Sequence, residues 1–472
     1  MKTEQYGLSA CCLALGLSAA LDAQIARAET IPAEEPGAKT AESAPKGWTD
    51  ADGLLEAMGA NINDAGFMKS NNLKFGGWIE TSVSGNTNSS PDRYNGTITF
   101  NDRDGEPQLN QFYLFFQKAV DVNGDSFDIG GRFDFLYGSD AIFTQAYGVP
   151  ALDPQTGQPL NRGHWDLNLV SHDHRFYGIA LPQAYAEINL PVGNGLSVKV
   201  GHFYTPIGYE VVTAPDNFFV TKPYTFQYGE PFTHTGFLGN YTINSNWSVM
   251  AGAVTGSATG GWDGNWDRQL GNWDFLGGIA WTSDDAGSSL ALTSSAGGRS
   301  EHSSSAWAIY SIVGKHNFTD KLHYVFQHDH GFAENVLTAN SLVTGRTETA
   351  EWYGINQYLF YDIQDNLAAG IRAEWWRDAN GFRVAGPVRC GASFNVDRTT
   401  GTGSTYACGP SFGNYPFAGS DYYALTLGMT YKPAPWILLR PNLRYDHADI
   451  TVFDSGRRRN QLLITGDVVI LF

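Results

Sequence analysis

Residues 127–137 read Phe-Asp-Ile-Gly-Gly-Arg-Phe-Asp-Phe-Leu-Tyr. Apolar or small side chains occupy the odd positions, and the even positions are mostly polar, which is the two-residue period of a strand with one apolar and one wet face. Residues 436–446 repeat the pattern, with Ile437, Leu439 and Leu443 alternating against Arg and Asn. A soluble sandwich and a membrane barrel both permit such strands, so the connections between them must decide.

Segments with this period recur from residue 72 to the end of the chain. We expect strands at residues 72–84, 109–121, 127–138, 182–191, 196–206, 234–244, 246–256, 272–283, 288–295, 305–315, 320–331, 348–361, 366–378, 419–432, 436–447 and 460–472. Short turns built from Asn, Gly, Asp and Pro alternate with longer polar loops. The longer loops are expected at residues 85–108, 139–181, 207–233, 257–271, 296–304, 332–347, 379–418 and 448–459. This alternation is typical of an outer-membrane barrel, so we predict an all-β, antiparallel, up-and-down transmembrane barrel of about 16 strands, with periplasmic turns and outer loops.

The composition agrees with a membrane barrel and argues against a helical membrane protein and a nucleic-acid-binding protein. Only 17% of the 472 residues are charged, the net charge is −18, and the chain contains 28 Phe, 23 Tyr and 13 Trp. The mean hydropathy is −0.26, and the sequence contains no run of about 20 apolar residues, the length that a helix needs to cross a bilayer. A chain with so few basic residues is a poor ligand for nucleic acid, so we expect no nucleic-acid partner.

The first residues resemble an export signal. Residues 8–21 form a short apolar run, and Ala26-Arg27-Ala28 has the small-x-small form that precedes signal-peptide cleavage. We therefore predict a secretory signal peptide at residues 1–28 and a flexible lead-in with a short helix at residues 29–71. The barrel domain would cover residues 72–472, and the protein would reach a Gram-negative-type outer membrane through the Sec route.

Two cysteines remain after the predicted signal, Cys390 and Cys408. In an exported protein a single pair favours one disulfide that closes a long loop. A metal site would need more ligands nearby than these stretches offer, and we predict no metal and no cofactor. His328 and His330 share one strand face, and so could bind a metal, but a lumen or loop position for such histidines is the commoner case.

Aromatic residues mark the expected membrane boundaries. Trp273 and Trp281 lie on one face, eight residues apart, or about 26 Å along a strand, which would place them near the two aromatic girdles of a barrel. Ordinary packing aromatics are the alternative. The last strand alternates up to a terminal Phe472, which resembles the signal read by the outer-membrane barrel assembly machinery.

One loop carries a family resemblance. The chain reads Gly-His-Phe-Tyr-Thr-Pro-Ile-Gly-Tyr-Glu at 201–210, Ala-Pro-Asp-Asn-Phe-Phe at 214–219, and Tyr-Gly-Glu-Pro-Phe-Thr-His-Thr-Gly at 228–236. This string resembles the signature region of the OmpL-like putative β-barrel porin family, and the barrel pattern extends the resemblance over residues 72–472. The resemblance implies an outer-membrane barrel and a pore, and says little about the solute.

Loop 207–233 is also unusual in itself, since it is aromatic and contains several prolines. Such a segment should pack against something, and we predict that it folds into the barrel mouth and sets a constriction, as the third loop does in the 16-stranded diffusion porins that this arrangement resembles. The constriction would pair charged loop residues with wall cations across an eyelet whose field selects solutes. The loop residues are Glu210, Asp216, Lys222 and Glu230, and the wall residues are Arg132, Lys199, Arg372, Arg440 and Arg444. A packed outer cap with solvated charges is the alternative.

The predicted function is passive diffusion of small hydrophilic solutes or ions through this lumen, without catalysis. The sequence leaves two alternatives open, a lipid hydrolase at the barrel rim and a closed structural or adhesion barrel. The expected partners are outer-membrane lipid, the barrel assembly machinery and small polar solutes, and a homotrimer is left open.

Overall fold

The computed structural model describes residues 53–89, 93, 95–121, 126–144, 177–257, 260–261, 264–265, 270–299, 302–336, 344, 346–384, 419–454 and 456–472. The predicted signal peptide at 1–28 and the predicted disulfide between Cys390 and Cys408 lie outside these residues.

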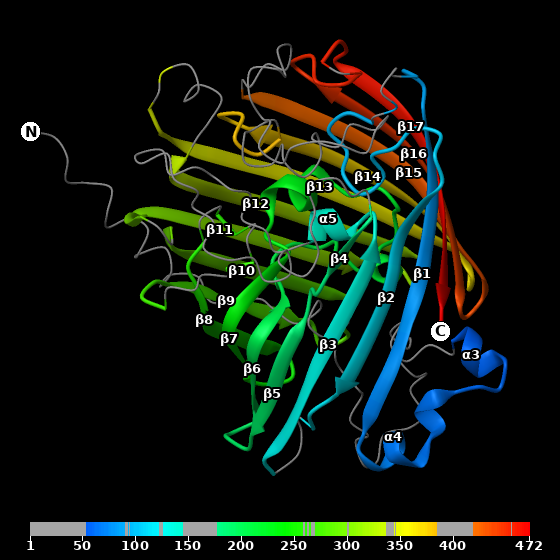
Figure 1. Cartoon of the computed structure of the whole chain (residues 1–472), viewed down its shortest axis with the longest axis vertical. Helices are drawn as coiled ribbons and strands as arrows, with labels where there is room; N and C mark the ends of the chain where they lie inside the picture. The colour runs from blue at the N-terminus through cyan, green and yellow to red at the C-terminus, as the bar shows by residue number, and fades with distance from the viewer. Residues whose placement is uncertain are drawn as a thin grey trace, which may run out of the picture.

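The strands form one closed antiparallel sheet (Figure 1). In chain order they are β1 (Leu73–Asn86), β2 (Gln108–Lys118), β3 (Asp128–Gly138), β4 (Gly178–Ala180), β5 (Ala184–Leu190), β6 (Leu196–Tyr204), β7 (Thr233–Thr242), β8 (Trp247–Thr255), β9 (Trp273–Thr282), β10 (Ser288–Arg299), β11 (His302–Asn317), β12 (Leu322–Val336), β13 (Glu348–Gln364), β14 (Leu367–Asp378), β15 (Ser420–Ala434), β16 (Ile437–Ala448) and β17 (Asn460–Leu471). Each strand pairs with the next along the chain, except that β4 and β5 both pair with β3, and β1 pairs with both β2 and β17.

β4 and β5 are two parts of one strand, because both pair with β3 in the antiparallel sense. Pro182 lies between them and has no N–H to donate to the ladder. The 17 segments of the sheet therefore make a barrel of 16 strands, which confirms the predicted fold class and strand number. β4 itself lies in a stretch predicted as loop.

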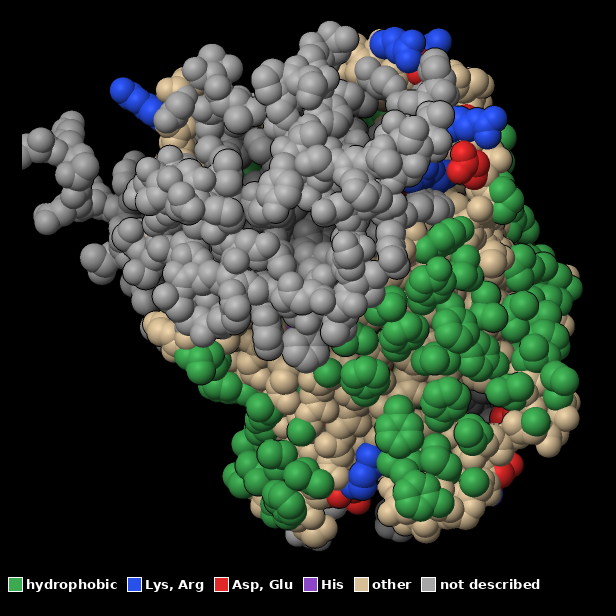
Figure 2. Space-filling view, viewed as in Figure 1, with side chains coloured by type: hydrophobic (Ala, Val, Ile, Leu, Met, Phe, Trp, Pro, Cys, Tyr) green, Lys and Arg blue, Asp and Glu red, His purple; other side chains and the backbone are tan. Residues whose placement is uncertain are grey.

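The wet faces of the strands point inward and the apolar faces point outward. In β3, Arg132 and Asp134 are buried, whereas Phe133 and Tyr137 are exposed. Figure 2 shows hydrophobic side chains gathered on the outer surface over β1, β2 and β3. This inside-out pattern suits a wall that meets lipid outside and polar groups inside.

The two ends of the strand-forming chain meet at the β1–β17 seam. Trp78 pairs with Leu471 at one end of the ladder and Asn86 pairs with Leu463 at the other. Beyond it, the Gly77 N–H donates to the Phe472 carbonyl at 3.0 Å, and the Phe472 N–H donates to the Gly77 carbonyl at 2.9 Å. The seam leaves no strand edge open to lipid.

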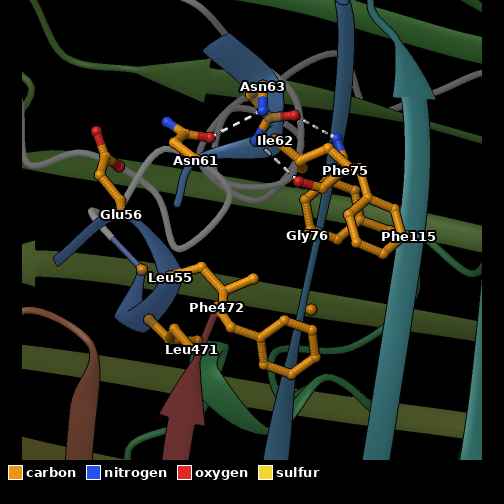
Figure 3. Close-up of a pocket in the computed structure, with 12 residues that line it drawn as sticks. Leu55, Glu56, Asn61, Ile62, Asn63, Phe75, Gly76, Phe115, Leu471 and Phe472 are labelled. Carbon is orange, nitrogen blue, oxygen red and sulfur yellow. Dashed lines mark hydrogen bonds between the residues drawn. The ribbon is translucent and has the colours of Figure 1, made fainter. Parts of the chain in front are cut away.

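A short helical segment packs against this seam, and it contains α3 (Leu54–Ala57), η2 (Ile62–Asp64) and α4 (Gly66–Ser70). Asn63 accepts from the Phe75 N–H at 2.8 Å and donates to the Phe75 carbonyl at 2.9 Å. Figure 3 shows these bonds beside a small cavity that Phe115 and Phe472 also line. The short helix expected within residues 29–71 is matched by α3, which lies beside the barrel wall next to Phe472.

The remaining helical turns are α5 (Ala141–Thr144), η4 (Ala214–Asp216) and η5 (Thr225–Gly229). None of the helices in the described ranges has the length and apolar character that a membrane crossing requires.

Candidate functional site

The connection between β6 and β7, residues 205–232, lies inside the ring of strands, and we call it the inner loop. Its residues bond to inward-facing side chains of distant strands. Gln111 on β2 accepts from the Ala214 N–H at 3.2 Å, and Asn356 on β13 donates to Thr225 at 2.6 Å. Figure 1 shows the green trace of this region within the barrel wall. The loop therefore spans the barrel interior from its own strands to the opposite wall.

Arg372 on β14 joins the inner loop to the wall. Its guanidinium pairs with Glu210 of the loop at 2.6 Å and with Glu374 of its own strand at 2.7 Å. It also donates to the Thr221 carbonyl at 2.7 Å and lies 5.0 Å from the ring centre of Phe219. Because the side chain is fully buried, removing it would leave Glu210 without this partner in a low-dielectric interior.

Arg444 on β16 has the same kinds of partner as Arg372, namely two carboxylates, a loop carbonyl and an aromatic ring. Its guanidinium pairs with Glu374 at 2.9 Å and with Asp446 at 2.8 Å. It donates to the Lys222 carbonyl at 2.9 Å and lies 5.1 Å from the ring centre of Tyr224. Glu374 is thus shared by two arginines, and its other oxygen accepts from the Tyr224 N–H at 2.9 Å.

Arg440, also on β16, binds the first part of the inner loop. It donates to the carbonyl oxygens of Ala214 at 2.6 Å and Asn217 at 2.7 Å. Its charge is balanced by Asp467 on β17, with which it pairs, and by Glu80 on β1 at 3.3 Å. All three arginines therefore use loop carbonyls and wall carboxylates together, which fixes the loop without leaving a buried charge alone.

Aromatic packing adds to these polar anchors. Phe218 lies 4.7 Å from Phe360 of β13, and Tyr209 lies 4.9 Å from Tyr358 of the same strand, measured between ring centres. Such contacts are worth about 0.5–1.5 kcal/mol each beyond the buried area. The apolar side chains, because of which the sequence predicted that this loop would not extend into water, thus pack against the inner wall.

Part of the connection between β1 and β2, residues 95–101, also folds inward and covers part of the inner loop. Gln227 accepts from the Thr99 N–H at 2.6 Å, and Tyr228 donates to the Thr97 carbonyl. Phe100 packs on Phe226 with ring centres 5.6 Å apart. This contact lies inside the barrel, so the inner loop is held between the wall and residues 95–101.

Glu230 lies in a different environment from the other charged residues of the loop. The Gln327 amide on β12 donates to Glu230 at 2.7 Å and to Asp329 at 2.8 Å, so one amide bridges two buried carboxyl groups. Burial raises the pKa of Glu230 well above its usual value, and the neighbouring Asp329 charge raises it further. Glu230 can therefore hold a proton at a pH where exposed carboxyls are ionised.

Lys222 is buried as well and donates to the Val211 carbonyl at 2.8 Å. Burial lowers the pKa of this ammonium to about 8, and the Glu210 charge opposes part of the shift. Burial also raises the pKa of Asp140, between β3 and α5, to about 6. These two loop groups therefore titrate much closer to neutral pH than the same side chains in water.

The other predicted site residues have partners outside the Arg372, Arg440 and Arg444 anchors. Asp216 accepts from Thr213 of the same loop at 2.6 Å. Arg132 pairs with Asp134 at 2.7 Å, and the Lys199 ammonium lies 4.9 Å from the ring centre of Tyr185. The structure thus brings Glu210 to Arg372 and the loop backbone to Arg440 and Arg444, and the roles of these residues toward a solute stay predictions.

Sequence reasoning missed the wall carboxylates that accompany the arginines. Arg132, Arg372 and Arg444 each precede an acidic residue by two positions, and residues two apart share one face of a strand. That spacing was a readable signal for Asp134, Glu374 and Asp446. Glu80 and Asp467 had no such signal, because they reach Arg440 from other strands.

No group of three or more His, Cys, Asp or Glu side chains suited to a metal ion occurs among the described residues. His328 and His330, considered above as ligands, lie on the outer face of β12, away from the inner loop, because the alternate residues of that strand are the buried ones.

Comparison with known proteins identifies a family. The sequence profile described as "Putative beta-barrel porin-2, OmpL-like" matches residues 72–472. Curated proteins yield no match. Solved structures with a similar chain path include the outer-membrane channel DcaP of Acinetobacter baumannii, with 10% identity, coverage of 85% of this chain and 97% of that chain, and a TM-score of 0.47. OprB of Pseudomonas putida at high pH has 13% identity, coverage of 87% and 97%, and a TM-score of 0.47. OmpF of Salmonella typhi in complex with daunomycin has 11% identity, coverage of 86% and 99%, and a TM-score of 0.48.

Proposed function

The chain belongs to the putative beta-barrel porin-2, OmpL-like family, and from this premise we propose that it is an outer-membrane channel for small hydrophilic solutes or ions. Solutes would move by passive diffusion through a lumen that the inner loop narrows. This mechanism needs no cofactor and no catalytic cycle, and it uses the barrel as a wall and the loop as a filter.

The observation that carries the proposal is the anchoring of the inner loop to inward-facing side chains of β2, β13, β14, β15 and β16. A loop fixed at so many points keeps the narrowest part of a channel at constant width. The buried arginines and carboxylates beside it would act on a passing ion through the low-dielectric protein, because a charge does not need solvent contact to create a field.

Planar-bilayer conductance of the mature chain tests the proposal. We expect discrete, stable steps, and a reversal potential in a salt gradient that reports the sign of the selected ion. A folded barrel that never conducts would overturn the proposal. The burial of the inner loop and of residues 95–101 also suits a closed barrel, so the absence of conductance would favour that second function.

The route to the membrane belongs to the same proposal. We infer export through the Sec route by the signal at 1–28, and recognition of the last strand by the assembly machinery through Phe472. Phe472 is bonded to Gly77 at the seam, so its backbone also takes part in closing the barrel. Replacing Phe472 with Ala and measuring the folded fraction in the outer membrane separates this role from export.

A further inference from the structure

The end of the inner loop meets strand β12 through a pair of carboxyl groups. Glu230 of the loop and Asp329 of β12 are both buried, and the Gln327 amide donates to the first at 2.7 Å and to the second at 2.8 Å. The two carboxyl groups are also hydrogen-bond partners of each other. Ionised carboxylates only accept hydrogen bonds, so a bond between the two groups requires a proton on one of them.

No other group compensates two negative charges at this place. One oxygen of each carboxyl group, Glu230 Oε2 and Asp329 Oδ1, receives no hydrogen bond from a donor of the protein. Among the described residues, no Lys or Arg forms an ion pair with either group, and Arg372 is engaged by Glu210 and Glu374. Because a buried carboxylate without compensation is costly, the pair is most stable with one proton and one negative charge.

The other titratable groups nearby do not supply the missing positive charge. Glu210 of the inner loop is negative and raises the pKa of Glu230 further. Tyr358 on β13 is buried and faces Glu210 rather than the pair. His328 interacts with Asp329 through its charge but points outward from β12. A proton held between the two carboxyl groups is therefore the simplest way to balance this site.

Glu230 is also in contact with the start of the inner loop. A Cβ added to Gly208 would overlap Glu230 Oε2, so the backbone at Gly208 packs directly on this carboxyl group. At the end of the loop, the Glu230 N–H donates to the Thr225 carbonyl at 3.0 Å, and Phe232 accepts from the Thr205 N–H at 2.9 Å. A change in the charge of Glu230 therefore acts on both ends of the loop.

We propose that Glu230 and Asp329 share a proton that holds the end of the inner loop against β12, and that loss of this proton to water at higher pH releases the loop end and widens the channel. We call the pair the carboxyl latch. Without the proton, two adjacent carboxylates repel each other in a low-dielectric interior. The latch stands on the contacts of the described residues alone, whereas the widening rests on the proposed channel function.

The pH at which the loop end is released depends on Glu230. Burial raises the pKa of this group well above its usual value, so the closed loop binds the proton more tightly than the released loop does. The latch is therefore complete below the ordinary Glu pKa of about 4.3 and is lost as pH rises through the raised value. Between these two values, the equilibrium constant for release grows by about tenfold per pH unit.

Amide hydrogen exchange of the full mature chain in lipid nanodiscs from pH 5 to pH 8, corrected for the intrinsic pH dependence of exchange, measures this release. In the wild type we expect exchange at residues 224–233 to rise by about tenfold per pH unit until the pair has titrated. Glu230→Gln keeps a donor toward Asp329 without a proton that titrates, so its exchange should not depend on pH. Glu351→Gln, which changes an exposed carboxyl on β13, is the matched control and should follow the wild type.

Two further measurements exclude other sensors. His328→Gln removes an imidazole, a group that can titrate between pH 5 and pH 8, and should keep the wild-type pH dependence. If this variant loses the dependence, the imidazole is the sensor and the proposal is overturned. Carboxylate oxygens also bind hard cations, so protection that calcium chloride restores at pH 8 would replace the proton by a metal and overturn the proposal as well. Heat-modifiable gel mobility reports whether each variant is folded.

Planar-bilayer conductance over the same pH range connects the latch to the channel. We expect the conductance of the wild type to rise reversibly from pH 5 to pH 8 and that of Glu230→Gln to stay constant. Exchange that is independent of pH in the wild type, or equally dependent on pH in the wild type and Glu230→Gln, would overturn the latch. Constant conductance beside pH-dependent exchange would overturn the widening. Exchange that depends on pH in a barrel that never conducts would overturn the channel function and leave the latch standing.

Discussion

Arg372→Ala is the variant that tests most directly how the inner loop is held. The wild-type guanidinium pairs with Glu210 at 2.6 Å and Glu374 at 2.7 Å, and bonds to the Thr221 carbonyl at 2.7 Å. Glu374 would keep Arg444 at 2.9 Å, whereas Glu210 would lose the cation on which it depends. Breaking one side of such a buried pair costs about 3–5 kcal/mol, because the remaining charge is left without compensation.

The matched control lies on the same strand. Arg377 on β14 points outward and pairs with Asp421 at 2.7 Å, with both side chains partly exposed. An exposed pair contributes about 0–1 kcal/mol, so Arg377→Ala should lower the free energy of unfolding much less than Arg372→Ala. Urea unfolding in lipid, followed by gel mobility and tryptophan fluorescence, measures both differences.

A rescue variant and the channel current make the test sharper. Adding Glu210→Gln to Arg372→Ala removes the unpaired carboxylate and should restore part of the lost stability. In the bilayer, Arg372→Ala should give noisier or larger conductance steps, because the middle of the inner loop is released from the wall. If Arg372→Ala and Arg377→Ala destabilise equally, and the conductance is unchanged, the reasoning about the loop anchors is refuted.

Three further predictions concern other parts of the structure. In Glu230→Gln a neutral amide replaces a carboxyl whose pKa is raised by burial. The folded wild type binds more protons than the unfolded chain, so its stability falls as pH rises above the ordinary Glu pKa of about 4.3. The urea midpoint of the variant should therefore exceed that of the wild type by a margin that grows from pH 5 to pH 8. A parallel pH dependence of the two proteins would contradict this. Gly208→Ala should destabilise the protein by more than the roughly 1–2 kcal/mol that a left-handed backbone costs an Ala, because at φ +95° the new Cβ would overlap the Glu230 carboxylate. Gly59→Ala is the control, because at φ +75° it has open space around it and should lose only the backbone contribution. Equal unfolding midpoints for the two variants would count against the contact. Asn63→Ala removes two bonds to Phe75. At about 1 kcal/mol for each bond, amide hydrogen exchange at the start of β1 should rise by about thirtyfold, with the exposed Asn71→Ala as control. Unchanged exchange at Phe75 would show that the helical segment does not hold the seam.

The barrel could be predicted from sequence because its signals are local. A period of two fixes which side chains share a face, and the alternation of turns and loops fixes the antiparallel order, so residues 127–137 and 436–446 carried most of the argument. The break at Pro182 was not predicted, since the short pairing of Gly178–Ala180 with the end of β3 depends on how β3 extends.

Long-range pairings, in contrast, needed the tertiary structure. Arg440 meets Glu80 across 360 positions of the chain, and nothing local marks such a partner. Glu230 was predicted to face a cation but lies beside Gln327 and Asp329, because the direction of a loop side chain is set by the packing of its neighbours.

The fold class, the inward position of the wall arginines and the tendency of the loop after β6 to pack inside the barrel could all be predicted from local sequence patterns. The wall residues that this loop contacts, and the direction in which the histidines of β12 point, depend on the tertiary structure. The stretch Gln327-His-Asp-His-Gly331 is polar on both faces, so alternation alone cannot say which row faces outward. The closed ring decides it, because pairing with β11 and β13 fixes the register of β12, and with it the side of the wall on which each side chain lies.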